Sequence, residues 1–339
     1  MRLIKTEDAV GHVLCHDMTQ IIKDQYKDAR FRKGHVVTEE DIPVLLSMGK
    51  EHLYVWEMTP GMVHENDAAE RLLALCGQEN MIRSGVKEGK IELKAACDGV
   101  FLVDSARLVA VNSQDEVMIA TRKGGMAVRE GDKLAGMRVI PLIIEEEKLR
   151  KAEQAAGDKP LLSLKPYVRK TACIVATGGE VKKGLIKDTF TPVVIDKLKT
   201  YGIETLEVVY SGDGVENVRD AVLTMREKKP DMILCTGGMS VDPDDNTPGG
   251  IKAAGANIIA YGAPVLPGAM FLLGYFDDGM PVMGLPGCVM YAGATVFDLV
   301  LPKIAADVPV TRADLAALSE GGLCLGCKPC HYPICPFGK

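Results

Sequence analysis

The sequence has no apolar run of 18 residues, the usual signature of a membrane-spanning helix. Its N-terminus, residues 1–8, lacks the apolar core of a secretory signal. Lysine and arginine are scattered in pairs such as Lys182 and Lys183, and the formal net charge is −6, so the chain has no dense basic stripe for nucleic acid. We therefore expect a cytoplasmic protein that binds neither membranes nor nucleic acids.

The chain does have enough apolar residues for a large core. Of its 339 residues, 47% are hydrophobic and 25% are charged, which is typical of soluble globular proteins. A chain of this length usually folds as two domains. The first, residues 1–150, is predicted to be an α+β domain of no evident role, because strand-like pieces alternate with turn residues and two segments, 39–48 and 66–75, have apolar side chains at helical spacing.

A linker and a second domain are predicted to follow. Residues 151–168 include Gly157, Pro160 and Pro166, which together are typical of a linker. From 169 to 310, apolar strand-like runs alternate with amphipathic helices, which predicts a three-layer α/β domain with a mostly parallel sheet and helices on both faces. The expected strands are 172–176, 204–210, 231–235 and 280–283, and the expected helices are 191–201, 215–228 and 292–301.

Paired glycines follow the first and third of these strands. In such sheets, ligands bind beyond the carboxyl ends of the strands. Glycine lets the backbone come close to a ligand and point N–H groups at it, while hydroxyl groups add donors for phosphate oxygens. The alternative is a simple tight turn in each place. The candidate cofactor-binding residues here are Thr177, Gly178, Gly179, Thr236, Gly237, Gly238 and Ser240.

Acidic residues gather at the same strand ends. Five carboxylates would repel a phosphate unless a divalent cation lay between them, which favours Mg²⁺. The alternative is a solvated acidic loop in which Asp245 or Thr247 begins the next helix. A further turn with Pro286 and Gly287, before a predicted helix, is a weaker candidate for an anion site. The acids are Glu180, Asp213, Asp242, Asp244 and Asp245.

Taken in order, these motifs resemble the molybdopterin-binding domain shared by molybdopterin adenylyltransferases and molybdopterin molybdotransferases. The segment 236–248 is similar to the family's glycine turn followed by an acid and Thr-Pro, and 285–287 is similar to its LPGNP loop. The resemblance covers about residues 171–307. It implies a phosphate-bearing pterin ligand, a homo-oligomer, and catalytic roles for the acids Asp245, Glu180 and Asp213.

The chain departs from the family pattern at two loops. Cys288 and Val289 replace the family's Asn-Pro, and Leu266 and Ala269 stand where lysines are usual. Two functions therefore stay open. One is Mg²⁺-assisted insertion of molybdate into adenylated molybdopterin; the other is a non-catalytic carrier that keeps the cofactor for a molybdoenzyme. A hydrolase similar to nicotinamide-nucleotide amidases is a minor third possibility, because such enzymes can carry a related domain.

Four of the ten cysteines crowd into the C-terminal segment 311–339. Their spacing, C-x₂-C-x₂-C-x₄-C, could bring all four thiolates to one Zn²⁺ ion or one iron–sulfur cluster, with His331 as a substitute ligand. The alternative is a flexible tail with free thiols. The remaining six cysteines are dispersed and are expected to be buried thiols. The candidate metal ligands are Cys324, Cys327, Cys330 and Cys335.

Overall fold

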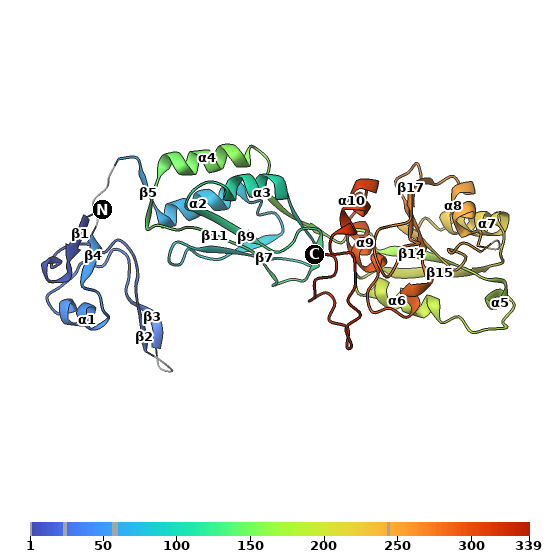
Figure 1. Cartoon of the computed structure of the whole chain (residues 1–339), viewed down its shortest axis with the longest axis horizontal. Coiled ribbons are helices and arrows are strands. Elements are labelled where there is room, and N and C mark those ends of the chain that lie inside the picture. The colour runs from blue at the N-terminus through green and yellow to red at the C-terminus, as the bar shows by residue number, and fades with distance from the viewer. Residues whose placement is uncertain (1, 23–25, 56–59, 243–244) are drawn as a thin grey trace. The chain divides into compact units, whose positions relative to one another are not determined.

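The computed structural model describes residues 2–22, 26–55, 60–242 and 245–339, and the chain divides into two compact units (Figure 1). The two units are not continuous in sequence. Within the described ranges no helix is long and apolar enough to cross a membrane. Unit 1 comprises 1–96, 103–124 and 131–163, and unit 2 comprises 97–102, 125–130 and 164–339.

Unit 1 is a mixture of short helices and antiparallel sheets. Its main sheet has the strand order β6-β7-β11-β9. The two helices expected from apolar spacing are present as α1 and α2, whereas α3 was not predicted. The helices are α1 (Asp41–Ser47), α2 (Glu65–Leu75), α3 (Ser105–Asn112) and α4 (Glu146–Ala156). The strands are β1 (Arg2–Lys5), β2 (Met18–Ile22), β3 (Tyr26–Phe31), β4 (His52–Val55), β5 (Met62–His64), β6 (Met81–Arg83), β7 (Ile91–Ala95), β9 (Val117–Thr121), β11 (Lys133–Val139) and β12 (Ile143–Glu145).

The segment 151–168, predicted to be a linker, contains regular secondary structure. Its first residues belong to α4, and near its end lies β13 (Leu162–Pro166), which joins β8 (Gly99–Val103) and β10 (Met126–Val128) in the strand order β10-β8-β13. Buried leucines explain the difference, since Leu162 and Leu164 are each only 1% exposed. Pro166 is the last residue of the strand, where the missing N–H of proline is tolerated.

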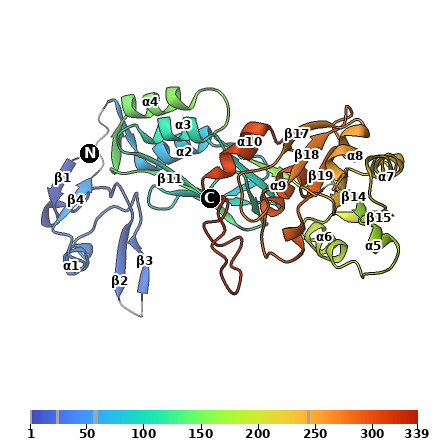
Figure 2. The same ribbon diagram turned by 45° about the vertical axis from the view of Figure 1, so that its right-hand side comes forward.

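Unit 2 is built on a six-stranded sheet with the order β15-β14-β16-β19-β18-β17 (Figure 2). The first four strands are parallel to one another, and β18 and β17 continue the sheet in antiparallel pairing. The expected α/β character of this segment is therefore observed. The strands are β14 (Thr171–Thr177), β15 (Glu204–Ser211), β16 (Met232–Thr236), β17 (Asn257–Tyr261), β18 (Leu272–Tyr275) and β19 (Pro281–Leu285).

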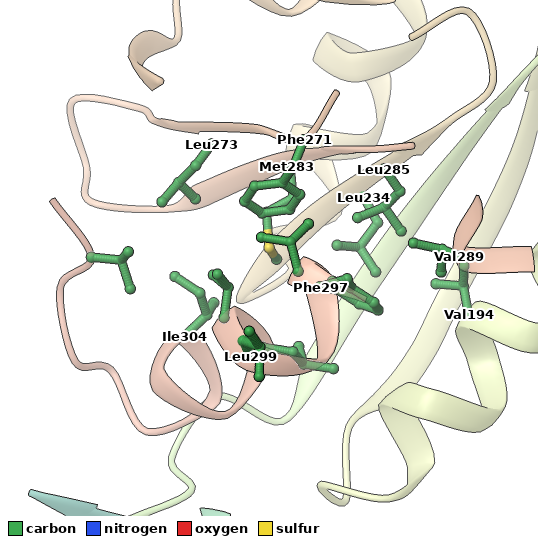
Figure 3. Packing of buried hydrophobic residues seen from close by; sticks show 14 of the residues in the cluster. Val194, Leu234, Phe271, Leu273, Met283, Leu285, Val289, Phe297, Leu299 and Ile304 are labelled. Carbon is green, nitrogen blue, oxygen red and sulfur yellow. The ribbon is translucent and has the colours of Figure 1, made fainter. Parts of the chain in front are cut away.

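Two separate apolar clusters hold helices to this sheet. One joins alternate residues of the central strands to α6 (Phe190–Lys199) and α9 (Val296–Ala305), and Figure 3 shows Phe297 of α9 beside Leu234 and Met283 of the strands. The other uses the intervening strand residues and packs α7 (Val215–Glu227) and α8 (Thr247–Ala253). Alternate side chains of a strand point to opposite faces, so the central strands contribute to both clusters.

Helix α9 begins four residues later than the predicted helix 292–301. Its start is set by a capping box. The Thr295 side chain accepts a hydrogen bond from the backbone N–H of Asp298, and the Asp298 side chain accepts one from the backbone N–H of Thr295. Before it, residues Gly287–Met290 form a short 3₁₀ turn, η2. The apolar residues 289–294 satisfied a helical pattern, but the cap at Thr295 decided where the helix starts.

The first strand of the unit is fastened at its start by Asp231. The carboxylate accepts hydrogen bonds from the amide of Lys170 at 2.6 Å and from the amide and hydroxyl of Thr171, both at 2.9 Å. Partial burial opposes ionisation, but these hydrogen bonds and the charge of Arg169 outweigh it and lower the pKa of Asp231.

We expect this interaction to make stability fall at acid pH. A lowered folded-state pKa means that the stabilisation is complete above the ordinary value of 3.8 and is lost as the pH falls through the folded-state pKa. Urea titrations at pH 7 and pH 3 should show a smaller acid-induced loss of stability in Asp231→Asn than in the wild type. Equal losses in the two proteins would contradict this role.

Candidate functional site

Four parallel strands of unit 2 end at the same level of the sheet. Thr177 pairs with Ser211, Ala176 with Thr236, and Thr236 with Leu285. The loops that follow these strands therefore leave from one edge, which we call the loop edge. Its described residues are 177–183, 211–214, 236–242, 245–247 and 285–288. Of the predicted acids, Asp244 and the side chain of Glu180 lie outside the described residues.

The glycine pair after β16 has no room for side chains. Gly237 has a φ of +81°, and a Cβ there would stand 2.5 Å from the carbonyl oxygen of Thr177. Gly238 has a φ of +56°, and its Cβ would stand 2.7 Å from the hydroxyl oxygen of Thr247. Both the left-handed backbone and the close approach require glycine. This geometry fits the alternative of a tight turn, and the role of these glycines in binding a cofactor stays a prediction.

The threonine hydroxyls of the turns serve the scaffold. The hydroxyl of Thr177 donates to the carbonyl oxygen of Thr236 at 2.9 Å, and the hydroxyl of Thr247 donates to the carbonyl oxygen of Gly237 at 2.9 Å. Thr177, Thr236 and Thr247 are all buried. In this structure the Thr177 hydroxyl cross-links the first and third loops, and its role as a donor to phosphate stays a prediction.

Asp213 joins the loops after β14 and β15. Its carboxylate accepts the backbone N–H of Gly179 at 3.0 Å. A Cβ at Gly179 would stand 2.7 Å from the same carboxylate oxygen, so only glycine allows the contact. Gly178, with a φ of +136°, turns the chain into this position. In the structure the predicted catalytic acid Asp213 orients a backbone N–H of the loop edge.

Asp245 shapes the acidic loop in a similar way. One of its carboxylate oxygens accepts the N–H of Asp242 at 3.3 Å, and the N–H of Asp245 donates to the carbonyl oxygen of Asp242 at 2.9 Å. Asp242 and Ser240 are exposed, and Asp245 is half-buried. Among the described residues no three His, Cys, Asp or Glu side chains lie close enough to hold one metal ion. The described acids thus do not form the cation cluster that their spacing suggested.

Two residues that the sequence pattern did not single out hold the same loop. The hydroxyl of Tyr261, at the end of β17, donates to the carbonyl oxygen of Met239 at 2.9 Å and lies 3.4 Å from that of Ser240. Met239 is buried against Gly284 of β19, where a Cβ would stand 2.5 Å from the Met239 sulfur. Burial, together with the negative charge of Asp245, raises the pKa of Tyr261, so its hydroxyl stays protonated as a donor.

A positive charge also reaches the loop edge. Lys182 is exposed, in the short helix α5 (Gly179–Lys182), and its amino nitrogen lies 3.9 Å from the point where a Cβ on Gly212 would stand. The ammonium group is therefore near the end of β15. The sequence pattern marked Lys182 only as one of a scattered basic pair, since nothing local shows that the helix turns it toward the second loop.

The fourth loop combines a buried proline with an exposed glycine. Pro286 is buried and Gly287 is exposed, and the carbonyl oxygen of Pro286 accepts the N–H of Val289 at 3.0 Å. Cys288, which replaces the family's asparagine, is half-buried, and burial raises the pKa of its thiol. At neutral pH this position therefore offers a neutral thiol where the family has an amide.

Comparisons with known proteins show which family the segment around the loop edge resembles. Residues 173–306 match a family described as a probable molybdopterin binding domain, and residues 3–57 match a domain of unknown function. CinA-like proteins of Mycobacterium tuberculosis and Petrotoga mobilis are 33% and 32% identical over 76 residues, which is 22% of this chain and 18% and 19% of theirs. The chain thus matches about a fifth of the length of these curated relatives.

Solved structures similar to part of the chain include two molybdopterin biosynthesis proteins. MoaB from Thermus thermophilus is 16% identical and covers 42% of this chain and 98% of its own, with a TM-score of 0.36. MogA is 22% identical and covers 41% of this chain and 100% of its own, also with a TM-score of 0.36. The family match at residues 173–306 confirms the resemblance that the sequence showed over residues 171–307. The segment 173–306 therefore belongs to the molybdopterin-binding domain family, a family related to molybdenum cofactor biosynthesis.

Proposed function

We propose that this chain binds molybdopterin, free or adenylated, at the loop edge. The observation that carries the proposal is the common level of the four strand ends, which brings the two glycine turns together at one place. Backbone N–H groups in such turns are suited to phosphate oxygens. Lys182 adds the positive charge that an anionic ligand needs.

The bound phosphate has to coexist with acidic side chains. Mg²⁺ is the cation that carboxylates and phosphates hold together most readily. We propose that Asp242 and Asp245, which belong to one turn held by the hydrogen bond from the Asp242 N–H to the Asp245 carboxylate, would supply carboxylate oxygens to it once the ligand is present. The metal would balance the charge of the phosphate, and the remaining loops would orient the pterin.

Within molybdenum cofactor biosynthesis, we propose that the chain acts as a carrier that keeps the cofactor for a molybdoenzyme. The carboxylates of Asp213 and Asp245 both accept backbone N–H groups of the loops, and Cys288 supplies a neutral thiol in place of the family's amide. These side chains are therefore engaged in holding the loops, which favours a carrier. Molybdate insertion, as in molybdotransferases, is the second candidate, supported by the family match and by Asp245 at the position of the family's functional acid.

Binding and turnover can be separated with adenylated molybdopterin, molybdate and Mg²⁺. We expect the purified chain to retain the adenylated pterin. Asp245→Asn should weaken binding about tenfold, or ~1.4 kcal/mol, because it removes a carboxylate charge that would hold the bridging Mg²⁺. Asp196→Asn is the matched control, because Asp196 is 76% exposed on α6 and pairs with Lys199 of the same helix. No retention of either pterin by the wild type would refute binding at this site.

Release of AMP in the same mixture distinguishes the two candidates. A carrier should release none above the rate without protein. Molybdate-dependent release that is lost in Asp245→Ala would instead establish the transferase. Release that is equal in the wild type and in Asp245→Ala would place the chemistry elsewhere in the protein.

A further inference from the structure

The C-terminal cysteines line a hollow of their own, separate from the loop edge. The hollow has a volume of about 340 Å³ and lies entirely within unit 2. All four cysteines contribute to its wall, together with Tyr291 and Tyr332. Cys324 and Cys335 are half-buried, and Cys327 and Cys330 are exposed. We call this the thiol pocket; its sulfur-bearing residues are Cys324, Cys327, Cys330 and Cys335.

The segment that carries these cysteines is fastened to the domain at its start. After α10 (Arg312–Ala316), the N–H of Cys324 donates to the carbonyl oxygen of Leu266 at 2.7 Å, and the N–H of Leu266 donates to the carbonyl oxygen of Gly322 at 2.8 Å. This short parallel bridge fixes the first cysteine relative to the sheet. A free tail would have no such pairing.

The same segment is fastened again at its end. Phe337 is 2% exposed and belongs to the apolar cluster around α9. The Tyr332 hydroxyl donates to the carbonyl oxygen of Asp298 at 3.0 Å, and the N–H of Gly338 donates to the carbonyl oxygen of Gly321 at 2.9 Å. The flexible-tail alternative is therefore wrong, and the thiols between these anchors are held around one space.

The backbone on the opposite wall of the pocket comes close to the sulfur atoms. A Cβ on Gly293 would stand 2.8 Å from the sulfur of Cys330. Gly293 has no left-handed backbone to explain its presence, so the contact with Cys330 is what requires glycine there. The wall is thus shaped around a thiol from a segment 37 positions away in sequence, as Gly293 and Cys330 show.

The hollow between the thiols of the thiol pocket favours a cluster over one ion. Four thiolates around a single Zn²⁺ ion would each lie about 2.3 Å from it and leave no hollow between them. Across the described ranges, no three His, Cys, Asp or Glu side chains lie close enough for such a site. In a cubane cluster each thiolate binds a different iron, so the sulfurs stand farther apart around a larger occupant.

We propose that the thiol pocket binds a [4Fe–4S] cluster through its four cysteine thiolates. The first three cysteines have the C-x₂-C-x₂-C spacing with which bacterial ferredoxins bind one cluster, whereas the fourth cysteine of the ferredoxin run binds the other cluster. Here Cys335 lines the same pocket as the other three. The cluster with its thiolates carries net negative charge, and Lys328 in the pocket wall supplies a positive charge near it. The proposal does not depend on what the loop edge binds.

The test is iron and acid-labile sulfide analysis of the full chain after anaerobic purification and after reconstitution with Fe²⁺, sulfide and thiol reductant. We expect about four irons and four sulfides per chain, with the broad visible absorption of a cluster. Cys327→Ser should lose most of the iron and sulfide. Cys327 is exposed, so the variant removes a ligand without removing core packing.

Cys97→Ser is the matched control, because Cys97 is a half-buried thiol of the same unit that does not line the thiol pocket. It should retain the full iron and sulfide content. One zinc per chain without sulfide would overturn the proposal in favour of a single ion. Failure to take up iron and sulfide by a folded wild-type chain, or equal loss in Cys327→Ser and Cys97→Ser, would also overturn it.

Discussion

Replacement of Gly237 by alanine should destabilise unit 2 by about 2–5 kcal/mol and weaken pterin binding at least about tenfold. The left-handed backbone at φ +81° costs an L-residue roughly 1–2 kcal/mol. The added Cβ would also stand 2.5 Å from the Thr177 carbonyl oxygen, and relief of such overpacking typically costs about 1–3 kcal/mol. Since the Thr177 carbonyl belongs to backbone, the loops after β14 and β16 must move apart.

Gly255→Ala separates the two contributions. Gly255 has a comparable φ of +92°, but nothing lies within 4 Å of its Cβ position. It should therefore show only the backbone cost of roughly 1–2 kcal/mol and leave pterin binding unchanged. Urea titration followed by circular dichroism measures stability, and retention of the pterin measures binding. If the two variants behave alike, the close contact of the loops does not matter for either property.

Replacement of Asp298 by alanine should cost about 3–5 kcal/mol, the range for removing one partner of a buried ion pair. The Asp298 carboxylate pairs with Lys197 of α6, and the two side chains are only 12% and 16% exposed. It also accepts the N–H and the hydroxyl of Thr295, at 2.7 and 3.1 Å. Alanine would leave a cation with little water around it and remove the cap that starts α9.

Asp314→Ala is the matched control for the cap alone. Asp314 forms the same capping box with Thr311 at the start of α10, but it has no ion pair among the described residues. The loss of a cap costs about 1 kcal/mol. Urea titration of both variants should therefore show a difference of about 2–4 kcal/mol. Equal losses would mean that the pair between α6 and α9 adds nothing to stability.

Local patterns predicted the part of the fold that depends on periodicity. The apolar strand β16 and the amphipathic helix α7 follow directly from alternation and from spacing of three and four residues. The glycine turns after β14 and β16 were recognised because a Gly-Gly pair directly follows each apolar strand-like run. These features are encoded in neighbouring residues, so a single sequence reveals them.

Long-range contacts account for what the sequence did not reveal. Tyr261 lies 21 and 22 positions from the two carbonyl oxygens that its hydroxyl approaches, and no local pattern marks it. Asp213 was predicted as a catalytic acid from its position after a strand, and no local pattern shows that its carboxylate accepts the N–H of Gly179. β13 was missed because Gly157 and the flanking prolines hid its buried leucines. The role of such a side chain depends on which distant residue it contacts in the fold, and its residue type alone does not reveal this.

The molybdopterin-family segment does not coincide with an independent stretch of chain. Residues 97–102 and 125–130 belong to unit 2 although they precede it in sequence. They carry most of β8 and all of β10, which extend from β13, and the hydroxyl of Tyr167 donates to the carbonyl oxygen of Gly99 at 2.9 Å. A cut at the unit boundary after Ser163 would divide β13 and remove its partner strand. Segments of the two units therefore alternate along the chain. A gene fusion or a recombination event that exchanged one unit at a single point would separate β13 from β8 and β10 and so break their sheet.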